Sequence, residues 1–172
     1  MIYLISGPGR SGKTTVARMI RDKTGSEILH GDVLREFFKV CLTPEDRVKY
    51  LPQNGKNEPR KAAFDDPVEV YKEEQKDAEN MKDGFEKIIQ FYAKREELAV
   101  FEGVHLLPEY MHEWREKYQN IKPIIVYRTD KEQIYTDITE NKGYHDWHKD
   151  VFQTEAEMEK LCCIFRCIRA MV

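Results

Sequence analysis

The sequence predicts an α/β fold in which helices cover both faces of a parallel sheet. Short apolar segments rich in β-branched residues alternate with segments of helical periodicity along the 172 residues. Residues 7–14 read Gly-Pro-Gly-Arg-Ser-Gly-Lys-Thr, which fits the pattern G-x-x-x-x-G-K-[ST]. An apolar segment leads directly into this octapeptide and a helical pattern follows it. The strand–loop–helix order therefore agrees with the motif, and we expect a three-layer α/β/α architecture.

The first half of the chain holds two expected strands. Residues 2–6 are apolar, and a helix is expected from about Gly12, because residues 16, 19 and 20 are apolar at helical spacing. Residues 26–30 form the second expected strand and residues 33–40 a second helix. Thr43 followed by Pro44 is a helix-start signal. We expect residues 52–60, which contain Pro, Asn and Gly, to be the least structured.

The second half repeats the alternation after a long helical insertion at about 44–97. Apolar residues fall on one stripe from Pro67 to about Glu97, and Gly84 is expected to mark a bend. Further strands are expected at 98–101, which ends in Glu102, and at 123–127. Helices are expected at 108–118, at 130–140 with Asp130 as the cap, and at 154–171; residues 141–150 form a lid-like connector between the last two. The whole chain, 1–172, is expected to be one domain.

Composition limits the function classes. The net charge is −3, which argues against a nucleic-acid partner bound by bulk positive charge. No run of 18 apolar residues occurs, so no membrane span is expected. Met1 directly precedes the first expected strand, and we expect a cytoplasmic protein. The four cysteines fit that compartment, and burial as small apolar side chains is favoured over a metal pair at Cys163 and Cys167.

We expect the octapeptide to be a phosphate-binding loop rather than a glycine turn that matches by chance. Its glycines let the backbone curl so that N–H groups point at phosphate oxygens. Lys13 can reach the β- and γ-phosphates, and the Thr14 hydroxyl suits Mg²⁺. The expected ligands are therefore ATP and Mg²⁺, in a P-loop NTPase fold that is NMP-kinase-like, with a parallel sheet of about four to five strands. The residues expected to bind nucleotide are Gly7, Gly9, Arg10, Ser11, Gly12, Lys13, Thr14, Thr15 and Arg128.

Four elements distant in sequence should meet at one edge of the sheet. Ligands of such sheets lie beyond the carboxyl ends of the strands. The phosphate loop, Asp32, Glu102 and Arg128 each follow one of the four expected strands. We therefore expect them to surround the site.

Among P-loop proteins, a small-molecule kinase fits best. GTPases need an N-K-x-D guanine reader, and residues 141–144 read Asn-Lys-Gly-Tyr, without the Asp. A small chain with a long helical insertion between the second and third strands is typical of kinases whose insertion closes over an acceptor.

Two further motifs resemble the 2-phosphoglycerate-kinase-like family of P-loop kinases. Residues 30–36 read His-Gly-Asp-Val-Leu-Arg-Glu, and residues 101–108 read Phe-Glu-Gly-Val-His-Leu-Leu-Pro. Residues 165–170, Phe-Arg-Cys-Ile-Arg-Ala, are similar to the helix that follows the lid in that family. The resemblance implies transfer of the γ-phosphate of Mg·ATP to a small hydroxylated, anionic acceptor. It departs from the family in two respects: the lid-like segment lacks arginines, and no fifth strand follows the last helix.

The expected catalytic residues are Lys13, Asp32, Arg35 and Glu102, with Thr14 and Glu102 at the metal. Asp32 would accept the proton of the acceptor hydroxyl, although a role as helix N-cap is open. Arg35 would hold an anionic group of the acceptor, or be a solvated surface arginine. Glu102, at the end of an apolar strand, would orient Mg²⁺ through water. His105 would contact the acceptor or make a structural hydrogen bond.

Other roles stay open at this point. Arg128 would stack on adenine or brace phosphates, or else pair with Asp130. A nucleoside or nucleotide kinase is an alternative, although the scarcity of lid arginines weighs against it. A regulatory module that binds nucleotide without transferring phosphate is another, and a homodimer or a partner chain that completes the sheet is also open.

Overall fold

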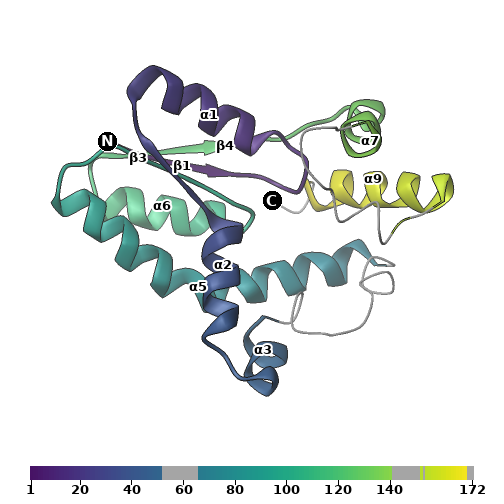
Figure 1. The fold of residues 1–172 in the computed structure, drawn as a ribbon, viewed down its shortest axis with the longest axis horizontal. Helices are drawn as coiled ribbons and strands as arrows, with labels where there is room; N and C mark the ends of the chain where they lie inside the picture. The colour runs from purple at the N-terminus through teal and green to yellow at the C-terminus, as the bar shows by residue number, and fades with distance from the viewer. Residues whose placement is uncertain (52–65, 141–151, 153, 170–172) are drawn as a thin grey trace.

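Four parallel strands form the centre of the computed structural model, which describes residues 1–51, 66–140, 152 and 154–169. They are β1 (Ile2–Ser6), β2 (Glu27–His30), β3 (Ala99–Glu102) and β4 (Ile121–Ile125). Their order in the sheet is β2-β3-β1-β4, and every pairing is parallel. This confirms the predicted α/β class, with four strands in the described part of the chain (Figure 1).

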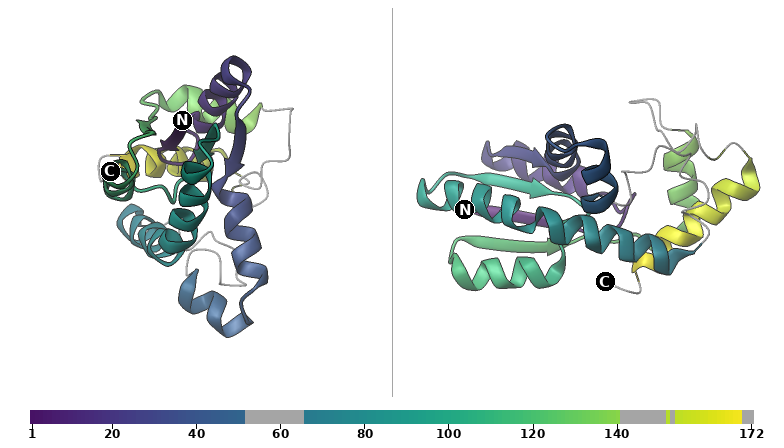
Figure 2. Two further views of the ribbon diagram at one scale, coloured as in Figure 1. Left: turned by 90° about the vertical axis from the view of Figure 1, so that its left-hand side faces the viewer. Right: turned by 90° about the horizontal axis from the view of Figure 1, so that it is seen from below.

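Helices cover both faces of the sheet because its side chains alternate. Ile2 and Leu4 of β1 face the larger core, to which α5 (Pro67–Lys94) and α6 (Pro108–Lys117) contribute. Ile5 faces a second cluster, which includes Ala17 of α1 (Lys13–Thr24) on the opposite face. The expected three layers are therefore present, with α1 on one side and α5 and α6 on the other (Figures 1 and 2).

The insertion between β2 and β3 is helical, as expected. It contains α2 (Gly31–Val40), α3 (Pro44–Tyr50) and α5. The Thr43 hydroxyl accepts a hydrogen bond from the Asp46 backbone N–H at 3.2 Å, which confirms the predicted start of α3. The helix α5 continues through Gly84, and the bend expected at this residue stays a prediction. The segment 52–60 lies outside the described residues.

The strand β4 begins at Ile121, two residues before the predicted start at Pro123. In the structure β4 is the last strand in the sheet order of the described residues, with β1 on one side. A proline, which lacks a backbone N–H, is tolerated in such a strand where no described strand faces its nitrogen.

A small second core lies beyond the carboxyl ends of the strands. It joins α7 (Lys131–Thr139), α9 (Glu155–Arg169) and the first turns of α5. Asp130 caps α7 as predicted, because its carboxylate accepts hydrogen bonds from the N–H groups of Glu132 and Gln133. The three helices border one side of the predicted site (Figures 1 and 2). The lid-like segment 141–150 lies outside the described residues.

Two further expectations concern membrane spans and the cysteines. Within the described ranges, no helix is both long enough and apolar enough to cross a membrane. Cys162 is buried, as expected for a small apolar side chain, whereas Cys41 and Cys163 are exposed. Those two side chains are therefore not part of a core, which corrects the expectation for them.

Candidate functional site

The predicted phosphate-binding loop connects β1 to α1 through left-handed backbone conformations. Gly7 has φ +147° and Gly12 has φ +97°. A side chain on Gly7 would also collide with the carbonyl oxygen of Val126. Arg10 adopts φ +60°, which is uncommon for a residue with a side chain. These conformations give the tight curl that the motif requires, and they explain why glycine is needed at positions 7 and 12.

Lys13 is buried within the loop and donates a hydrogen bond from Nζ to the carbonyl oxygen of Pro8 at 2.8 Å. Burial lowers the pKa of this ammonium, and the carboxylates of Glu102 and Asp32 oppose the shift. The carbonyl of Pro8 thus holds the cation in the loop, and a phosphate oxygen would be a stronger, charged partner for it.

Ser11, the residue before Gly12, carries a buried hydroxyl without a hydrogen-bond partner. Buried polar atoms are normally paired. A ligand in the loop is one group that could pair with this hydroxyl.

Glu102 lies at the carboxyl end of β3 and is 7% exposed. Its Oε1 accepts a hydrogen bond from the Thr14 hydroxyl at 3.2 Å. The same Oε1 lies 2.6 Å from Nδ1 of His30. The site thus brings together the predicted carboxylate and the predicted hydroxyl, from β3 and α1.

His30 is a site residue that the sequence analysis missed. It is the last residue of β2, and in the parallel register of β2 and β3 it lies opposite Glu102. The ring therefore fixes one carboxylate oxygen of Glu102. The signal was available in principle, because both residues end neighbouring strands, but it required the strand order.

The donor set at this place fits Mg²⁺. A threonine hydroxyl and a carboxylate are hard oxygen ligands, and Mg²⁺ is usually bound by one or two protein groups together with substrate phosphates and water. Thr14 and Glu102 would hold the ion, which would supply neutralisation of phosphate charge. Among the described residues, no three His, Cys, Asp or Glu side chains form a metal-binding group.

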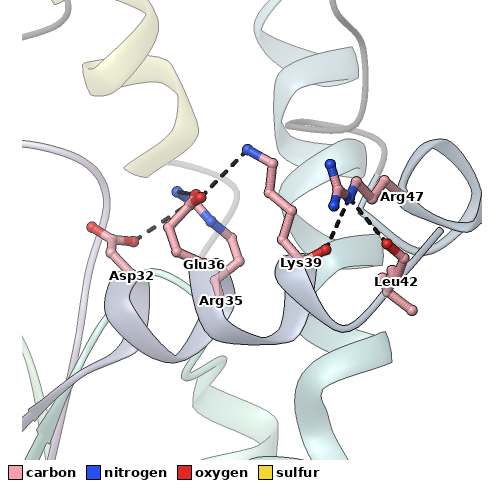
Figure 3. A network of polar contacts seen from close by, with 6 residues as sticks. All are labelled: Asp32, Arg35, Glu36, Lys39, Leu42 and Arg47. Atoms are coloured by element: carbon pink, nitrogen blue, oxygen red, sulfur yellow. Dashed lines mark hydrogen bonds and ion pairs between the residues drawn. The ribbon is translucent and has the colours of Figure 1, made fainter. Parts of the chain in front are cut away.

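Asp32 and Arg35 extend the site along α2 (Figure 3). Asp32 is not the N-cap: the helix begins at Gly31 with His30 as the cap residue, so the alternative reading of Asp32 is wrong. The Asp32 side chain is 72% exposed, and its Oδ1 lies 4.0 Å from Nη1 of Arg35. The carboxylate is therefore available to an acceptor.

Arg35 is not a solvated surface arginine either, because its side chain is only 13% exposed. Its Nη2 lies 3.3 Å from Glu36, and its Nε is buried without a hydrogen-bond partner. An arginine in this state retains a donor for a ligand.

Two glycines bring α2 against the loop that follows β3. A Cβ on Gly31 would lie 3.1 Å from the carbonyl oxygen of Glu102 and 3.3 Å from the Cα of Gly103. A Cβ on Gly103 would lie 3.2 Å from the Cα of Gly31. Close backbone approach thus positions Asp32 next to the end of β3.

His105, in the loop between β3 and α6, is 1% exposed, and neither ring nitrogen has a hydrogen-bond partner. Within the described residues, nothing therefore makes the structural hydrogen bond considered for this residue. Burial, together with the nearby cations of Arg35 and Lys13 and against the opposing carboxylate of Asp32, lowers its pKa to about 4. The imidazole is neutral at pH 7.

Arg128 lies beside the phosphate loop and pairs with α7. Its nearest guanidinium nitrogen is 3.8 Å from the place of a Cβ on Gly12. Its carboxylate partner is Asp137, not the predicted Asp130, whose carboxylate caps α7. The location agrees with the predicted role at the nucleotide, which stays a prediction.

Three further residues expected to bind nucleotide are accessible: Thr15 is exposed on α1, and Gly9 and Arg10 are partly exposed in the loop. The side chains of the motif at residues 165–170 lie outside the described ones. Glu74 on α5 was not anticipated: its charge acts on Lys13, so the first half of α5 borders the site. No local signal distinguishes Glu74 from the other acidic residues of that helix.

No protein-family model matches the sequence, and no curated protein matches it. The solved structures that match the chain include two of low sequence identity. One is an uncharacterized protein from Eubacterium ventriosum, with 17% sequence identity, a TM-score of 0.46, and coverage of 100% of this chain and 80% of that one. The other is shikimate kinase from Acinetobacter baumannii in complex with shikimate, with 20% identity, a TM-score of 0.43, and coverage of 97% of this chain and 78% of that one.

Proposed function

We propose that this chain is an ATP-dependent phosphotransferase that phosphorylates a hydroxyl group of a small, anionic metabolite, similar to 2-phosphoglycerate. One observation carries the proposal: the Thr14 hydroxyl of the phosphate loop donates to the buried carboxylate of Glu102 at 3.2 Å. This pair supplies the two oxygen ligands that a Mg·nucleotide needs next to Lys13.

The nucleotide would bind with its phosphates in the curl of the loop. Backbone N–H groups and the Lys13 ammonium would replace the present Lys13–Pro8 hydrogen bond with charged contacts to phosphate oxygens. The neutralisation of charge on the γ-phosphoryl group is the largest contribution expected from the protein. Arg128, beside Gly12, would brace the nucleotide from the α7 side.

The acceptor would bind between α2 and the loop after β3. Its hydroxyl would donate a proton to the Asp32 carboxylate while the hydroxyl oxygen attacks the γ-phosphorus. A bond forms between that oxygen and phosphorus, the bond to the β,γ-bridging oxygen breaks, and ADP leaves with the electron pair of the broken bond. Arg35 would hold the anionic group of the acceptor through charge-assisted hydrogen bonds.

The test is ADP release from Mg·ATP with a panel of phosphorylated and plain hydroxy acids, sugars, nucleosides and nucleotides. We expect stimulation by one anionic hydroxy compound, and loss of this stimulation in Asp32→Asn. If only a nucleoside or nucleotide stimulated ADP release, the proposed acceptor class would be wrong and a nucleoside or nucleotide kinase would take its place. Nucleotide binding without stimulation by any compound would contradict the transferase and favour a regulatory module.

A further inference from the structure

Buried polar atoms that lack a hydrogen-bond partner gather around the acceptor side of the site. They include Nε of Arg35 and both ring nitrogens of His105, with the Ser11 hydroxyl in the adjacent phosphate loop. An unmade hydrogen bond of a buried group costs free energy, and native structures contain few such groups. Several of them in one place indicate a ligand that completes their hydrogen bonds.

The fold brings His105 and Arg35 into one electrostatic environment. The close approach of Gly31 to Gly103 places the start of α2 against the loop that carries His105. The charges that act on the His105 ring are those of Arg35, Asp32 and Lys13. Two of these three groups are cations, so the surroundings favour an anion.

A neutral imidazole has one N–H donor and one nitrogen lone pair. A ligand that satisfies both must therefore present an acceptor and a donor. The two ring nitrogens point apart, so a phosphate oxygen would accept from the ring N–H while a hydroxyl of the same compound donates to the ring lone pair. A phosphate group carries about −1.5 to −2 charge at pH 7, against −1 for a carboxylate, and therefore suits the two cations better.

We propose that His105 and Arg35 form the specificity-determining subsite for the acceptor, and that this subsite selects a phosphate group over a carboxylate. The inference rests on the proposed function, because it assigns this subsite to the acceptor of a phosphotransferase. Arg35 supplies the positive charge and a buried N–H donor, and His105 supplies the paired donor and lone pair. Asp32, on the first turn of α2, keeps its proposed role as acceptor of the proton from the reacting hydroxyl.

The His105 ring is buried, so entry of such a group requires that neighbouring side chains move, and Arg35 is a candidate. The arginine is held by two weak contacts, 4.0 Å to Asp32 and 3.3 Å to Glu36, and both acids are exposed (Figure 3). Ion pairs of this kind contribute little to stability. A phosphate group can therefore replace both of them at low cost.

The experiment is an NMR titration of the histidine ring nitrogens in the full chain. The protein is first saturated with the Mg complex of a non-hydrolysable ATP analogue, so that the phosphate loop is filled. Inorganic phosphate and acetate are then added separately as probes. We expect the His105 signals to shift with phosphate and to saturate, and acetate to bind about tenfold more weakly or worse. The exposed His112 on α6, paired with Glu116, is the internal control for non-specific shifts.

Variants separate this subsite from the rest of the site. Arg35→Gln should abolish the saturable response of His105 to phosphate, whereas Lys39→Gln, which removes another cation of α2, should preserve it. If Arg35→Gln does not fold, the titration of the wild type with phosphate and acetate still tests the subsite. Absence of any saturable phosphate shift at His105 would overturn the subsite, and equal affinity for acetate would overturn the preference for a phosphate group.

The two proposals fail in different ways. If the ATP analogue itself does not bind, the proposed function fails at the nucleotide. If the analogue binds through the phosphate loop but neither probe reaches His105, the phosphotransferase remains and this subsite is wrong.

Discussion

Glu102 Oε1 lies 3.2 Å from Thr14 Oγ1, although 88 residues separate the two in sequence. Parallel pairing of β3 with β1 makes this contact, because Ile5 lies opposite Glu102 and the phosphate loop follows β1 directly. His30 fixes the same carboxylate oxygen from β2. Side chains from β2 and from the start of α1, which follows β1, therefore contact one oxygen atom of Glu102 at the end of β3.

Replacement of Glu102 by glutamine should separate metal binding from nucleotide binding. Glutamine retains an oxygen that accepts from Thr14, but it lacks the charge that favours Mg²⁺. We expect the gain in ATP affinity on addition of Mg²⁺, measured by calorimetry, to fall at least about tenfold. ATP affinity without Mg²⁺ should stay equal or rise, since one carboxylate is removed. An unchanged Mg²⁺ effect in Glu102→Gln would contradict the assignment.

Lys13→Met should weaken nucleotide binding without weakening the fold. The lysine is buried and burial lowers its pKa, so its charge costs desolvation free energy in the absence of ligand. We expect the dissociation constant for Mg·ATP to rise by at least about tenfold, while Tm stays equal or rises. Lys23→Met, on the exposed last turn of α1, is the matched control. A large fall in Tm with normal ATP binding would show that Lys13 is structural.

Asp32→Asn should reduce turnover far more than nucleotide affinity. Loss of a general base typically costs about 10²–10⁴ in rate. Because Asp32 does not cap α2 and is exposed, we expect the free energy of unfolding to change by less than about 0.5 kcal/mol. Asp22→Asn, an exposed acid on α1 paired with Arg21, is the control for loss of charge. Parallel losses of stability and turnover would point to a structural role.

Alanine at two helix glycines should act in opposite directions. Gly84 lies in an exposed part of α5 and nothing would contact its Cβ, so Gly84→Ala should stabilise by about 0.5–1 kcal/mol in urea unfolding. Gly31→Ala brings a Cβ to 3.1 Å from the Glu102 carbonyl oxygen, and the backbone must shift. We expect it to destabilise by about 1–3 kcal/mol and to lower turnover. Stabilisation by Gly31→Ala would contradict the close approach of α2 and the β3–α6 loop.

Stability should fall in mild acid through His105. Its pKa is about 4 when folded, below the usual 6.5, so the unfolded chain binds the proton more tightly between these values. The stability that the neutral His105 contributes is fully present above pH 6.5 and is lost as the pH falls toward 4. At pH 5 the free energy of unfolding should be lower by about 2 kcal/mol. Urea unfolding of the wild type and of His105→Gln at pH 7 and pH 5 measures this. Equal acid sensitivity of the two proteins would contradict a buried, neutral imidazole.

The sequence was sufficient for features encoded locally. The phosphate loop follows from its glycines and from the lysine and threonine after them, and the left-handed φ at Gly7 and Gly12 agrees with that reading. Asp130 was identified as a cap because a cap acts on its own next turn. The meeting of Asp32 and Glu102 followed from a general rule about the carboxyl ends of parallel strands.

Features that depend on strand order and burial could not be predicted. The contact of His30 with Glu102 requires β2 to lie next to β3, which spacing along the chain does not give. Arg35 was expected to be either a ligand or solvated, and only tertiary packing decides that its side chain is buried. Arg128 pairs with Asp137 rather than Asp130 because the Asp130 carboxylate is occupied by the N–H groups of α7.

The most direct test of the central claim follows the γ-phosphate itself. ATP labelled at the γ-position is incubated with Mg²⁺, the protein and the panel of acceptors, and the label is located afterwards. Our account predicts label on the hydroxyl of one anionic acceptor with the wild type, and strongly reduced label with Asp32→Asn. Label that stays in ATP, or appears only as inorganic phosphate with every acceptor, would contradict a phosphotransferase.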